Sequence, residues 1–258
     1  MTFDRYKRQI EVFGISGQEK LMKAKVLVIG AGGLGSPVIA YLAAAGVGRI
    51  GIVDGDSVEE SNLQRQIIHA GNLNENKAES AAKFVEKLNP DVVVDIYPYS
   101  INPKNAVDLI EPYDVVVGCP DSFRVRYLIN DACMLLKKPF VHAAVYGWEG
   151  ELSVFTGKPC YRCYLPKAPE ESGSAISGRA IIGATAGAFG AMQAAEVIKL
   201  VTESGDVATG RIVRGDLSTM EFFSFGIPEN PECPVCSGKL REILEENYTG
   251  RCEIRRYE

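Results

Sequence analysis

The chain of 258 residues carries a formal net charge of −5, with 46% hydrophobic and 24% charged residues. This balance is ordinary for a globular protein and excludes disorder throughout the chain. The mildly acidic composition also disfavours generic binding of nucleic acid, whose phosphate backbone is negatively charged.

The start of the chain and its most apolar stretch argue against export or membrane insertion. Residues 1–20 are charged and lack an apolar centre, so we expect no signal peptide. Residues 180–192 are small and apolar, but they are fewer than the about 20 residues that span a bilayer. We therefore expect a cytoplasmic protein with no membrane contact.

Short apolar runs alternate with helix-like segments in the first half of the chain. The apolar runs lie at 26–29, 50–53, 92–94 and 115–117. Unbroken runs of this length are typical of parallel strands that are buried on both faces. Apolar stripes at helical spacing over 78–88 and 125–136 predict helices between them. The alternation predicts an α/β fold with a Rossmann-like, doubly wound, mainly parallel sheet.

The pattern changes in the second half. Strand candidates at 151–155, 211–217 and 221–225 need not be parallel, so we expect them to extend the sheet with antiparallel strands. A helix rich in small residues is predicted over 181–202, and its glycines allow close approach of another element. Residues 166–178, rich in Pro, Ser, Gly and Glu, are interpreted as a mobile segment or an active-site lid.

A glycine-rich turn follows the first predicted strand directly and opens a helix. Its glycines are Gly30, Gly32, Gly33 and Gly35. Such a turn brings backbone N–H groups close to a phosphate at a helix N-terminus. Asp54 ends the second strand, where a carboxylate can accept hydrogen bonds from a ribose. The alternative is a glycine turn with no ligand.

The turn alone does not distinguish NAD from a nucleoside triphosphate. A triphosphate carries more charge and calls for cations, for which Arg8, Arg65 and Lys77 are candidates. Asp121 follows a strand at the edge where open α/β sheets bind ligands, and it could hold Mg²⁺ there. Each of these residues is otherwise a solvated surface charge.

Four of the seven cysteines form two CxxC pairs, Cys160 with Cys163 and Cys233 with Cys236. Four thiolates can close a tetrahedral Zn²⁺ site and leave no position for substrate, which implies a structural role. The alternatives are a redox dithiol or two reduced surface pairs.

Other reactive or aromatic residues are given structural interpretations. His69 and His142 are expected to be buried and hydrogen-bonded, and Cys133 to lie in the core. Cys119 could approach the nucleotide, and Cys252 is a weak candidate for an exposed nucleophile. Core packing is the expected role of three phenylalanines, with a partner surface as the alternative: Phe222, Phe223 and Phe225.

The chain resembles the MoeB/ThiF/HesA group, the prokaryotic relatives of ubiquitin-activating enzymes. The resemblance covers nearly the whole chain. It rests on the RYKRQ sequence at 5–9, the glycine turn, Asp54, the SNLQRQ sequence at 61–66, Lys77, Asp121, Arg126, Asn130 and both CxxC pairs.

The resemblance implies a single adenylation domain over 1–258, with a nucleotide-binding half at 1–146 and a partner and zinc half at 147–258. It implies that ATP adenylates the C-terminal glycine carboxylate of a ubiquitin-like sulfur carrier of the MoaD or ThiS kind, releasing pyrophosphate. Arg8 would reach the site of a partner subunit, which implies a homodimer. The expected nucleotide-site residues are Gly30, Gly32, Gly33, Gly35, Asp54, Asp56, Ser61, Asn62, Gln64, Arg65, Lys77, Asp121 and Ser122. Of these, Arg65, Lys77 and Asp121 are expected to be catalytic together with Arg8.

Three departures from the family pattern bear on mechanism. Pro120-Asp121-Ser122 replaces Thr-Asp-Asn, and Asn74 replaces a glycine. Residues 172–178 lack the loop cysteine of many relatives, which puts a thioester or persulfide step in doubt but not adenylation. The alternatives are adenylation of a small-molecule carboxylate, a nicotinamide-dependent oxidoreductase that leaves the three cations unexplained, and an inactive ATP-binding scaffold.

Overall fold

The computed structural model describes residues 3–169 and 180–254. Its centre is an eight-stranded sheet of order β3-β2-β1-β4-β5-β6-β7-β8. The strands are β1 (Lys25–Ile29), β2 (Arg49–Val53), β3 (Val93–Tyr97), β4 (Val115–Gly118), β5 (Phe140–Tyr146), β6 (Glu149–Phe155), β7 (Arg211–Asp216) and β8 (Glu221–Gly226). The first five strands are parallel and the last three are antiparallel, which confirms the predicted α/β class.

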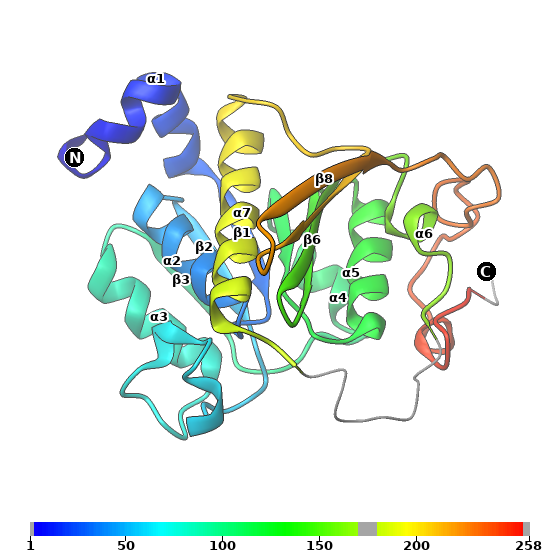
Figure 1. Cartoon of the computed structure of the whole chain (residues 1–258), viewed down its shortest axis with the longest axis horizontal. Helices are drawn as coiled ribbons and strands as arrows, with labels where there is room; N and C mark the ends of the chain where they lie inside the picture. Colours follow the sequence, from blue (N-terminus) through cyan, green and yellow to red (C-terminus); the bar gives the residue numbers. More distant parts are fainter. Residues whose placement is uncertain (1–2, 170–179, 255–258) are drawn as a thin grey trace.

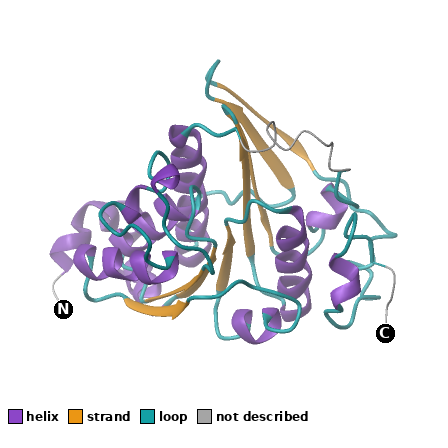
Figure 2. Ribbon diagram, turned by 90° about the horizontal axis from the view of Figure 1, so that it is seen from below, coloured by secondary structure: helices purple, strands orange, loops and turns teal. Residues whose placement is uncertain are grey.

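Helices cover both faces of the sheet (Figures 1 and 2). The α-helices are α1 (Lys7–Lys23), α2 (Gly35–Ala45), α3 (Lys77–Leu88), α4 (Ala106–Ile110), α5 (Phe123–Leu136), α6 (Tyr161–Tyr164) and α7 (Gly183–Thr202). Short 3-10 helices are η1 (Phe3–Tyr6), η2 (Glu60–Asn62), η3 (Ile67–His69) and η5 (Glu245–Tyr248). None of the helices in the described residues is both long and apolar enough to cross a membrane.

Two hydrophobic cores lie on opposite faces of the sheet. Val26 and Val28 of β1 join one core with side chains of α1, α2, α3 and α7. Leu27 and Ile29 join the other core with side chains of α4, α5 and α6. Because successive side chains of a strand point to opposite faces, burial of both faces requires the unbroken apolar runs seen in the sequence.

The antiparallel end of the sheet is covered less completely. Every residue of β8 is exposed, and β8 is the edge strand. Phe222 stacks on Phe189 of α7 on one face, whereas Phe225 contacts Tyr164 of α6 on the other. Strands from residues 1–146 and from residues 147–258 thus share one sheet.

Candidate functional site

The glycine turn joins β1 to the N-terminus of α2 and cannot accommodate larger residues at two positions. Gly30 has φ 99°, and a Cβ there would lie 2.8 Å from the carbonyl oxygen of Cys119. A Cβ on Gly35 would lie 2.0 Å from the carbonyl oxygen of Gly30. The backbone therefore turns tightly enough to present N–H groups at the start of a helix, where an anion is stabilised.

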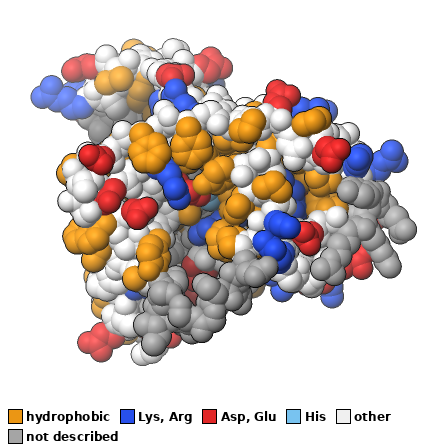
Figure 3. Space-filling view, turned by 45° about the vertical axis from the view of Figure 1, so that its right-hand side comes forward, with side chains coloured by type: hydrophobic (Ala, Val, Ile, Leu, Met, Phe, Trp, Pro, Cys, Tyr) orange, Lys and Arg blue, Asp and Glu red, His pale blue; other side chains and the backbone are white. Residues whose placement is uncertain are grey.

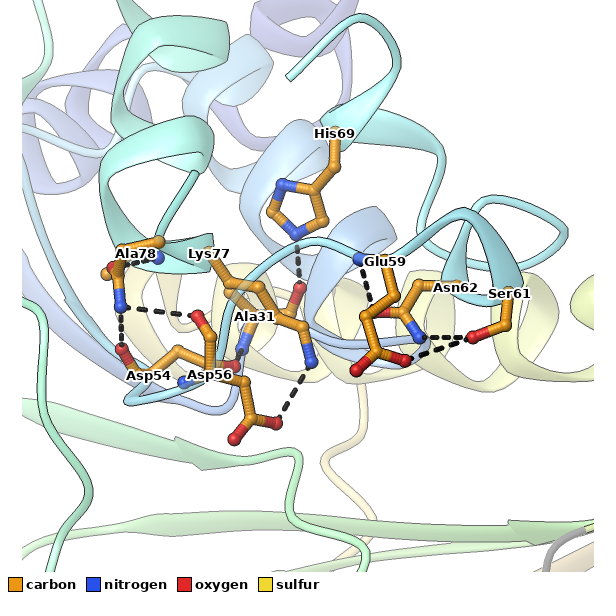
Figure 4. Close-up of polar contacts among 10 residues, drawn as sticks. Ala31, Asp54, Asp56, Glu59, Ser61, Asn62, His69, Lys77 and Ala78 are labelled. Atoms are coloured by element: carbon orange, nitrogen blue, oxygen red, sulfur yellow. Dashed lines mark hydrogen bonds and ion pairs between the residues drawn. The ribbon is translucent and has the colours of Figure 1, made fainter. Parts of the chain in front are cut away.

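The carboxylate of Asp54 is tied to this turn (Figure 4). Its two oxygens accept hydrogen bonds from the backbone N–H groups of Ala31, at 2.8 Å, and Asp56, at 2.9 Å. Burial raises the pKa of Asp54, while these two hydrogen bonds and the nearby Lys77 act against that shift. The arrangement fixes a carboxylate at the end of β2, directly beside the glycine turn.

Lys77 is the first residue of α3 and points to the same place (Figure 4). Its Nζ lies 3.0 Å from a carboxylate oxygen of Asp56. The Lys77 side chain is 8% exposed, whereas that of Asp56 is 74% exposed. A buried ammonium whose carboxylate partner reaches out into solvent can exchange that partner for a phosphate oxygen without a change in the fold.

Asn76, which the sequence analysis did not single out, holds these parts together. Its Nδ2 donates to the carbonyl oxygens of Asp54 and Asp56, and its Oδ1 accepts from the N–H groups of Ala78 and Glu79. An asparagine directly before an apolar helical stripe is the signal that could have identified this N-cap.

Asn74, which replaces the family glycine, lies in the left-handed region with φ 65°. Asparagine tolerates this region better than other residues with a side chain. Asn74 therefore suits the left-handed conformation that the turn before Lys77 requires.

Residues 59–66 bring Arg65 to the glycine turn. Asn62 accepts a hydrogen bond at Oδ1 from the Glu59 N–H, and Arg65 donates from Nη1 to the carbonyl oxygen of Ser61 at 3.1 Å. The Arg65 side chain lies 3.5 Å from the position of a Cβ on Gly33. Ser61 donates to Glu59, and Gln64 is exposed. Two polar side chains of this segment thus reach the turn, that of Arg65 and that of the buried Gln66, whose Nε2 lies 3.6 Å from the position of a Cβ on Gly32. The sequence analysis did not single out Gln66.

Asp121 and Ser122 lie between β4 and α5. Ser122 is the N-cap of α5 and accepts from the N–H of Val125. Asp121 is exposed and makes no hydrogen bond or ion pair within residues 3–169 and 180–254. Because the Cys119 carbonyl packs on Gly30, the loop that carries Asp121 starts beside the glycine turn. Asp121 is therefore available to a ligand at this edge of the sheet.

Arg8 is not brought to this site within one chain. It is exposed in the first turn of α1, and its neighbour Gln9 donates to the carbonyl oxygen of Ala45 at the C-terminal end of α2. The glycine turn is at the opposite end of α2, about 16 Å away at 1.5 Å of rise per residue. Any role of Arg8 at a nucleotide would concern the site of another copy.

Both histidines have the expected structural roles. His69 is fully buried, with its ring nitrogens 2.8 Å from Ser80 Oγ and 2.7 Å from the Ala31 carbonyl oxygen. His142 is buried in β5, and its Nε2 lies 3.3 Å from Glu151. Burial lowers the pKa of both imidazoles, so both are neutral at pH 7.

The burial of the three cysteines outside the CxxC pairs decides the expectations for them. Cys252 is buried, so it is not an exposed nucleophile. Cys119 is also buried, and its thiol faces Gln193, whereas its carbonyl approaches the glycine turn. Cys133 lies in the core as expected. Most of the segment interpreted as a lid falls outside the described residues.

The core-packing expectation for the three phenylalanines of β8 is wrong. Phe222, Phe223 and Phe225 are 47%, 59% and 39% exposed, because β8 is an edge strand that α6 and α7 cover only in part. Met220 at the hairpin turn is also exposed. Hydrophobic side chains gather in the middle of one face of the molecule, with basic side chains among them (Figure 3). This exposed apolar surface is typical of a protein-binding surface.

The two CxxC pairs meet as one cluster. The Sγ atoms of Cys160 and Cys233 are 3.7 Å apart, those of Cys163 and Cys236 are 3.6 Å apart, and all four lie within 4.8 Å of one another. None of the seven cysteines forms a disulfide bond. Zn–S bonds of about 2.3 Å would place the sulfurs of a tetrahedral site about 3.8 Å apart, so the cluster fits Zn²⁺.

Comparisons with known proteins show the family to which the chain belongs. A model of the ThiF family matches residues 6–235. The chain belongs to the ThiF family. It is 42% identical to the SAMP-activating enzyme E1 of Haloferax volcanii, over 97% of this chain and 95% of that protein. It is 40% identical to a sulfur carrier protein adenylyltransferase of Thermus thermophilus, over 98% and 97% of the two chains.

Longer relatives and solved structures extend the likeness. The chain is 41% identical to the adenylyltransferase and sulfurtransferase MOCS3 of Xenopus laevis, over 96% of this chain but 56% of that protein. The structure of E. coli MccB with succinimide superposes with a TM-score of 0.81 at 24% identity, covering 92% of this chain and 74% of MccB. At that identity MccB supports the fold alone.

Proposed function

We propose that this chain is an adenylyltransferase that activates the C-terminal glycine carboxylate of a ubiquitin-like sulfur-carrier protein with ATP. The carboxylate oxygen attacks the α-phosphorus, the bond from that phosphorus to the bridging oxygen of the β-phosphate breaks, and pyrophosphate leaves with the bonding electrons. The product is an acyl-adenylate. The names of the full-length relatives, a SAMP-activating E1 and a sulfur carrier protein adenylyltransferase, support this reaction class.

The observation that carries the proposal is the convergence of cations on a tight glycine turn. Lys77, Arg65 and the N-terminus of α2 lie together, and the one carboxylate paired with Lys77 is exposed. Adenylation needs positioning and neutralisation of charge, and it needs no general base because a carboxylate is already ionised at neutral pH. The burial of both neutral histidines is consistent with this chemistry.

Each predicted site residue receives a proposed role. The backbone of Gly30, Gly32, Gly33 and Gly35 would cradle the phosphates, Asp54 would accept from the ribose, and Arg65 and Lys77 would neutralise the phosphates. Asp121 would hold Mg²⁺, which would supply further positive charge beside the triphosphate. The other proposed nucleotide-site residues contribute through the loop around them: Asp56, Ser61, Asn62, Gln64 and Ser122.

A homodimer is proposed because Arg8 lies at the wrong end of α2 for its own site. If Arg8 serves the partner subunit, the variants Arg8→Ala and Asp121→Ala should both be inactive alone. Mixed dimers should regain about a quarter of the sites, since half of the dimers are mixed and each has one intact site. No recovery on coexpression would refute action across the dimer.

The cysteine cluster is proposed to hold a structural Zn²⁺ between residues 160–163 and 233–236. Four thiolates leave no open coordination position, so the metal would join distant segments and take no part in the reaction. Reduced cysteines fit a reducing compartment, and we propose that the protein works in the cytoplasm.

Pyrophosphate–ATP exchange tests the function. We expect exchange that depends on a purified ubiquitin-like carrier ending in Gly-Gly, and loss of exchange in Arg65→Ala and Asp121→Ala with folding intact. Exchange with a small carboxylic acid but with no carrier would favour the small-molecule alternative. The exposed aromatic surface of β8 favours the protein substrate, because a small acid does not require it.

A further inference from the structure

Arg126, in the first turns of α5, is a buried cation that is incompletely neutralised. Arg126 is only 8% exposed. Nη2 donates a long hydrogen bond of 3.4 Å to the Pro120 carbonyl oxygen, and the guanidinium lies 5.0 Å from the centre of the Phe123 ring. Within residues 3–169 and 180–254, Nε has no hydrogen-bond acceptor and no carboxylate lies within ion-pair distance.

A second buried arginine nearby has the opposite environment. Arg162 is 2% exposed, and its Nε and Nη2 donate to both carboxylate oxygens of Asp131. Its Nη1 donates to the carbonyl oxygen of Cys252. Burying a charge without a counterion is strongly unfavourable, so a buried arginine is normally neutralised in the manner of Arg162. The difference indicates that the counterion of Arg126 is an anion that residues 3–169 and 180–254 do not supply.

The groups that face Arg126 from the neighbouring elements supply no such anion. Tyr161 is buried and packs on the His142 ring, and a phenol hydroxyl carries no charge at neutral pH. The His142 imidazole is neutral as well. Glu151 is already engaged by His142, by Tyr164 at 2.8 Å and by Arg214 at 3.6 Å.

The position of Arg126 relates it to the proposed reaction. It follows Asp121 by little more than one helical turn, and it contacts the carbonyl of Pro120 in the loop that starts beside the glycine turn. On its other side, Tyr161 packs on Tyr164, and Tyr164 contacts Phe225 of the exposed aromatic surface. Arg126 is therefore linked through Pro120 to the loop beside the glycine turn, and through Tyr161 and Tyr164 to the surface proposed for a protein partner.

We propose that Arg126 binds the reacting carboxylate of the acyl substrate, by donating its Nε–H to the carboxylate oxygen that does not attack phosphorus. This inference rests on the proposed adenylation of a carrier. A carboxylate that approaches a triphosphate meets electrostatic repulsion, and a buried guanidinium offsets it through a charge-assisted hydrogen bond. In the acyl-adenylate, the same Nε–H would donate to the carbonyl oxygen.

The test compares two forms of one carrier, ending in the Gly-Gly carboxylate or in its carboxamide. Calorimetric titration of the wild-type dimer should show a preference of about 10-fold or more for the carboxylate. Arg126→Gln should abolish this preference without weakening ATP binding, and Arg126→Lys should restore part of it. Arg124→Gln, two residues away on the exposed side of α5, is the matched control and should keep the preference.

Each remaining outcome overturns the assignment. If Arg126→Gln retains the carboxylate preference but binds ATP more weakly, the anion is a phosphate of the nucleotide. If neither affinity changes, Arg126 binds no substrate group. If the wild-type protein binds neither form of the carrier, the carrier function itself is refuted, and the inference falls with it. Thermal unfolding of Arg126→Gln, expected to equal wild type, separates these outcomes from misfolding.

Discussion

Buried charges have different partners in two regions of the molecule. We define the cysteine lobe as α6, the four clustered cysteines and residues 227–254, and the nucleotide edge as the glycine turn with Asp54, Lys77 and Asp121. Arg162 and the Tyr248 hydroxyl of the cysteine lobe donate hydrogen bonds to Asp131 of the adjoining α5, so donors and acceptors are matched. At the nucleotide edge, the buried Lys77 is paired with Asp56, whose carboxylate is exposed. The charge of the lobe is thus matched by buried groups, whereas the charge of Lys77 is matched by a carboxylate in contact with solvent.

Removal of the metal should produce the largest loss of stability. If Zn²⁺ joins the two CxxC segments, its removal by a chelator, or Cys233→Ser, should lower the free energy of unfolding by several kcal/mol, because metal binding and folding are coupled. Metal analysis of the purified protein and thermal unfolding would measure this. A protein that contains no stoichiometric metal and is insensitive to chelator would contradict the metal assignment.

Breaking the buried ion pair between Arg162 of the lobe and Asp131 should produce the second-largest loss of stability. Arg162→Met leaves the carboxylate of Asp131 buried without its cation, so we expect a loss of about 3–5 kcal/mol in chemical denaturation. Arg124→Met removes an exposed ion pair with Glu245 and should cost less than about 1 kcal/mol. Equal losses of stability in the two variants would show that burial of the ion pair does not determine its contribution.

The N-cap at the nucleotide edge should have an intermediate effect. Asn76→Ala removes two acceptor and two donor contacts, so we expect a loss of about 1–2 kcal/mol of stability. It should also raise the KM for ATP, since Asp54 and Lys77 lose their common support. Asn76→Asp keeps the side-chain acceptor of the N-cap but loses the two donor contacts. Its stability should therefore lie closer to wild type than its KM for ATP does.

Lys77→Met should separate activity from stability. Pyrophosphate exchange should fall by about 100-fold or more, because a phosphate loses its cation. The free energy of unfolding should change by less than about 1 kcal/mol, since the partner Asp56 is exposed. The control is Lys83→Met, which removes an exposed lysine of the same helix. A comparable fall in exchange in this variant would argue against a specific role of Lys77.

The smallest effect on stability is expected at the exposed surface of β8. Phe223→Ser should leave thermal unfolding unchanged within error, because Phe223 is 59% exposed. It should still weaken carrier binding, which titration would measure, while ATP binding stays intact. Unchanged carrier binding in a Phe223→Ser, Phe225→Ser double variant would place the carrier elsewhere.

The sequence predicted the parallel strands well because their burial on both faces leaves unbroken apolar runs. It did not predict α1, in which Gly14 with φ 76° interrupts a polar helix, or α4, which has five residues. The exposure of Phe222, Phe223 and Phe225 was missed because an aromatic run does not indicate whether a helix covers its strand. The topology, not a local pattern, made β8 an edge.

Part of the candidate site could also be predicted from the sequence. The glycine turn has a local signature, since tight backbone approach requires glycine at Gly30 and Gly35. The pairing of Lys77 with Asp56 and the double role of Asn76 depend on how α3 meets the end of β2, which no local pattern specifies. The incomplete neutralisation of Arg126 within the described residues depends on neighbours from β5 and α6, so no local sequence pattern predicts it.

The packing of α7 has a consequence for the order in which the protein can mature during synthesis. A Cβ on Gly183 would lie 2.2 Å from the Gln64 carbonyl oxygen, and one on Gly190 would lie 2.4 Å from the Leu34 carbonyl oxygen. The loop that carries Arg65 and the start of α2 are thus braced by a helix translated more than a hundred residues later. A nascent chain that ends before α7 contains every proposed phosphate-binding residue but lacks this brace, so nucleotide binding should begin only when residues 183–202 have left the ribosome.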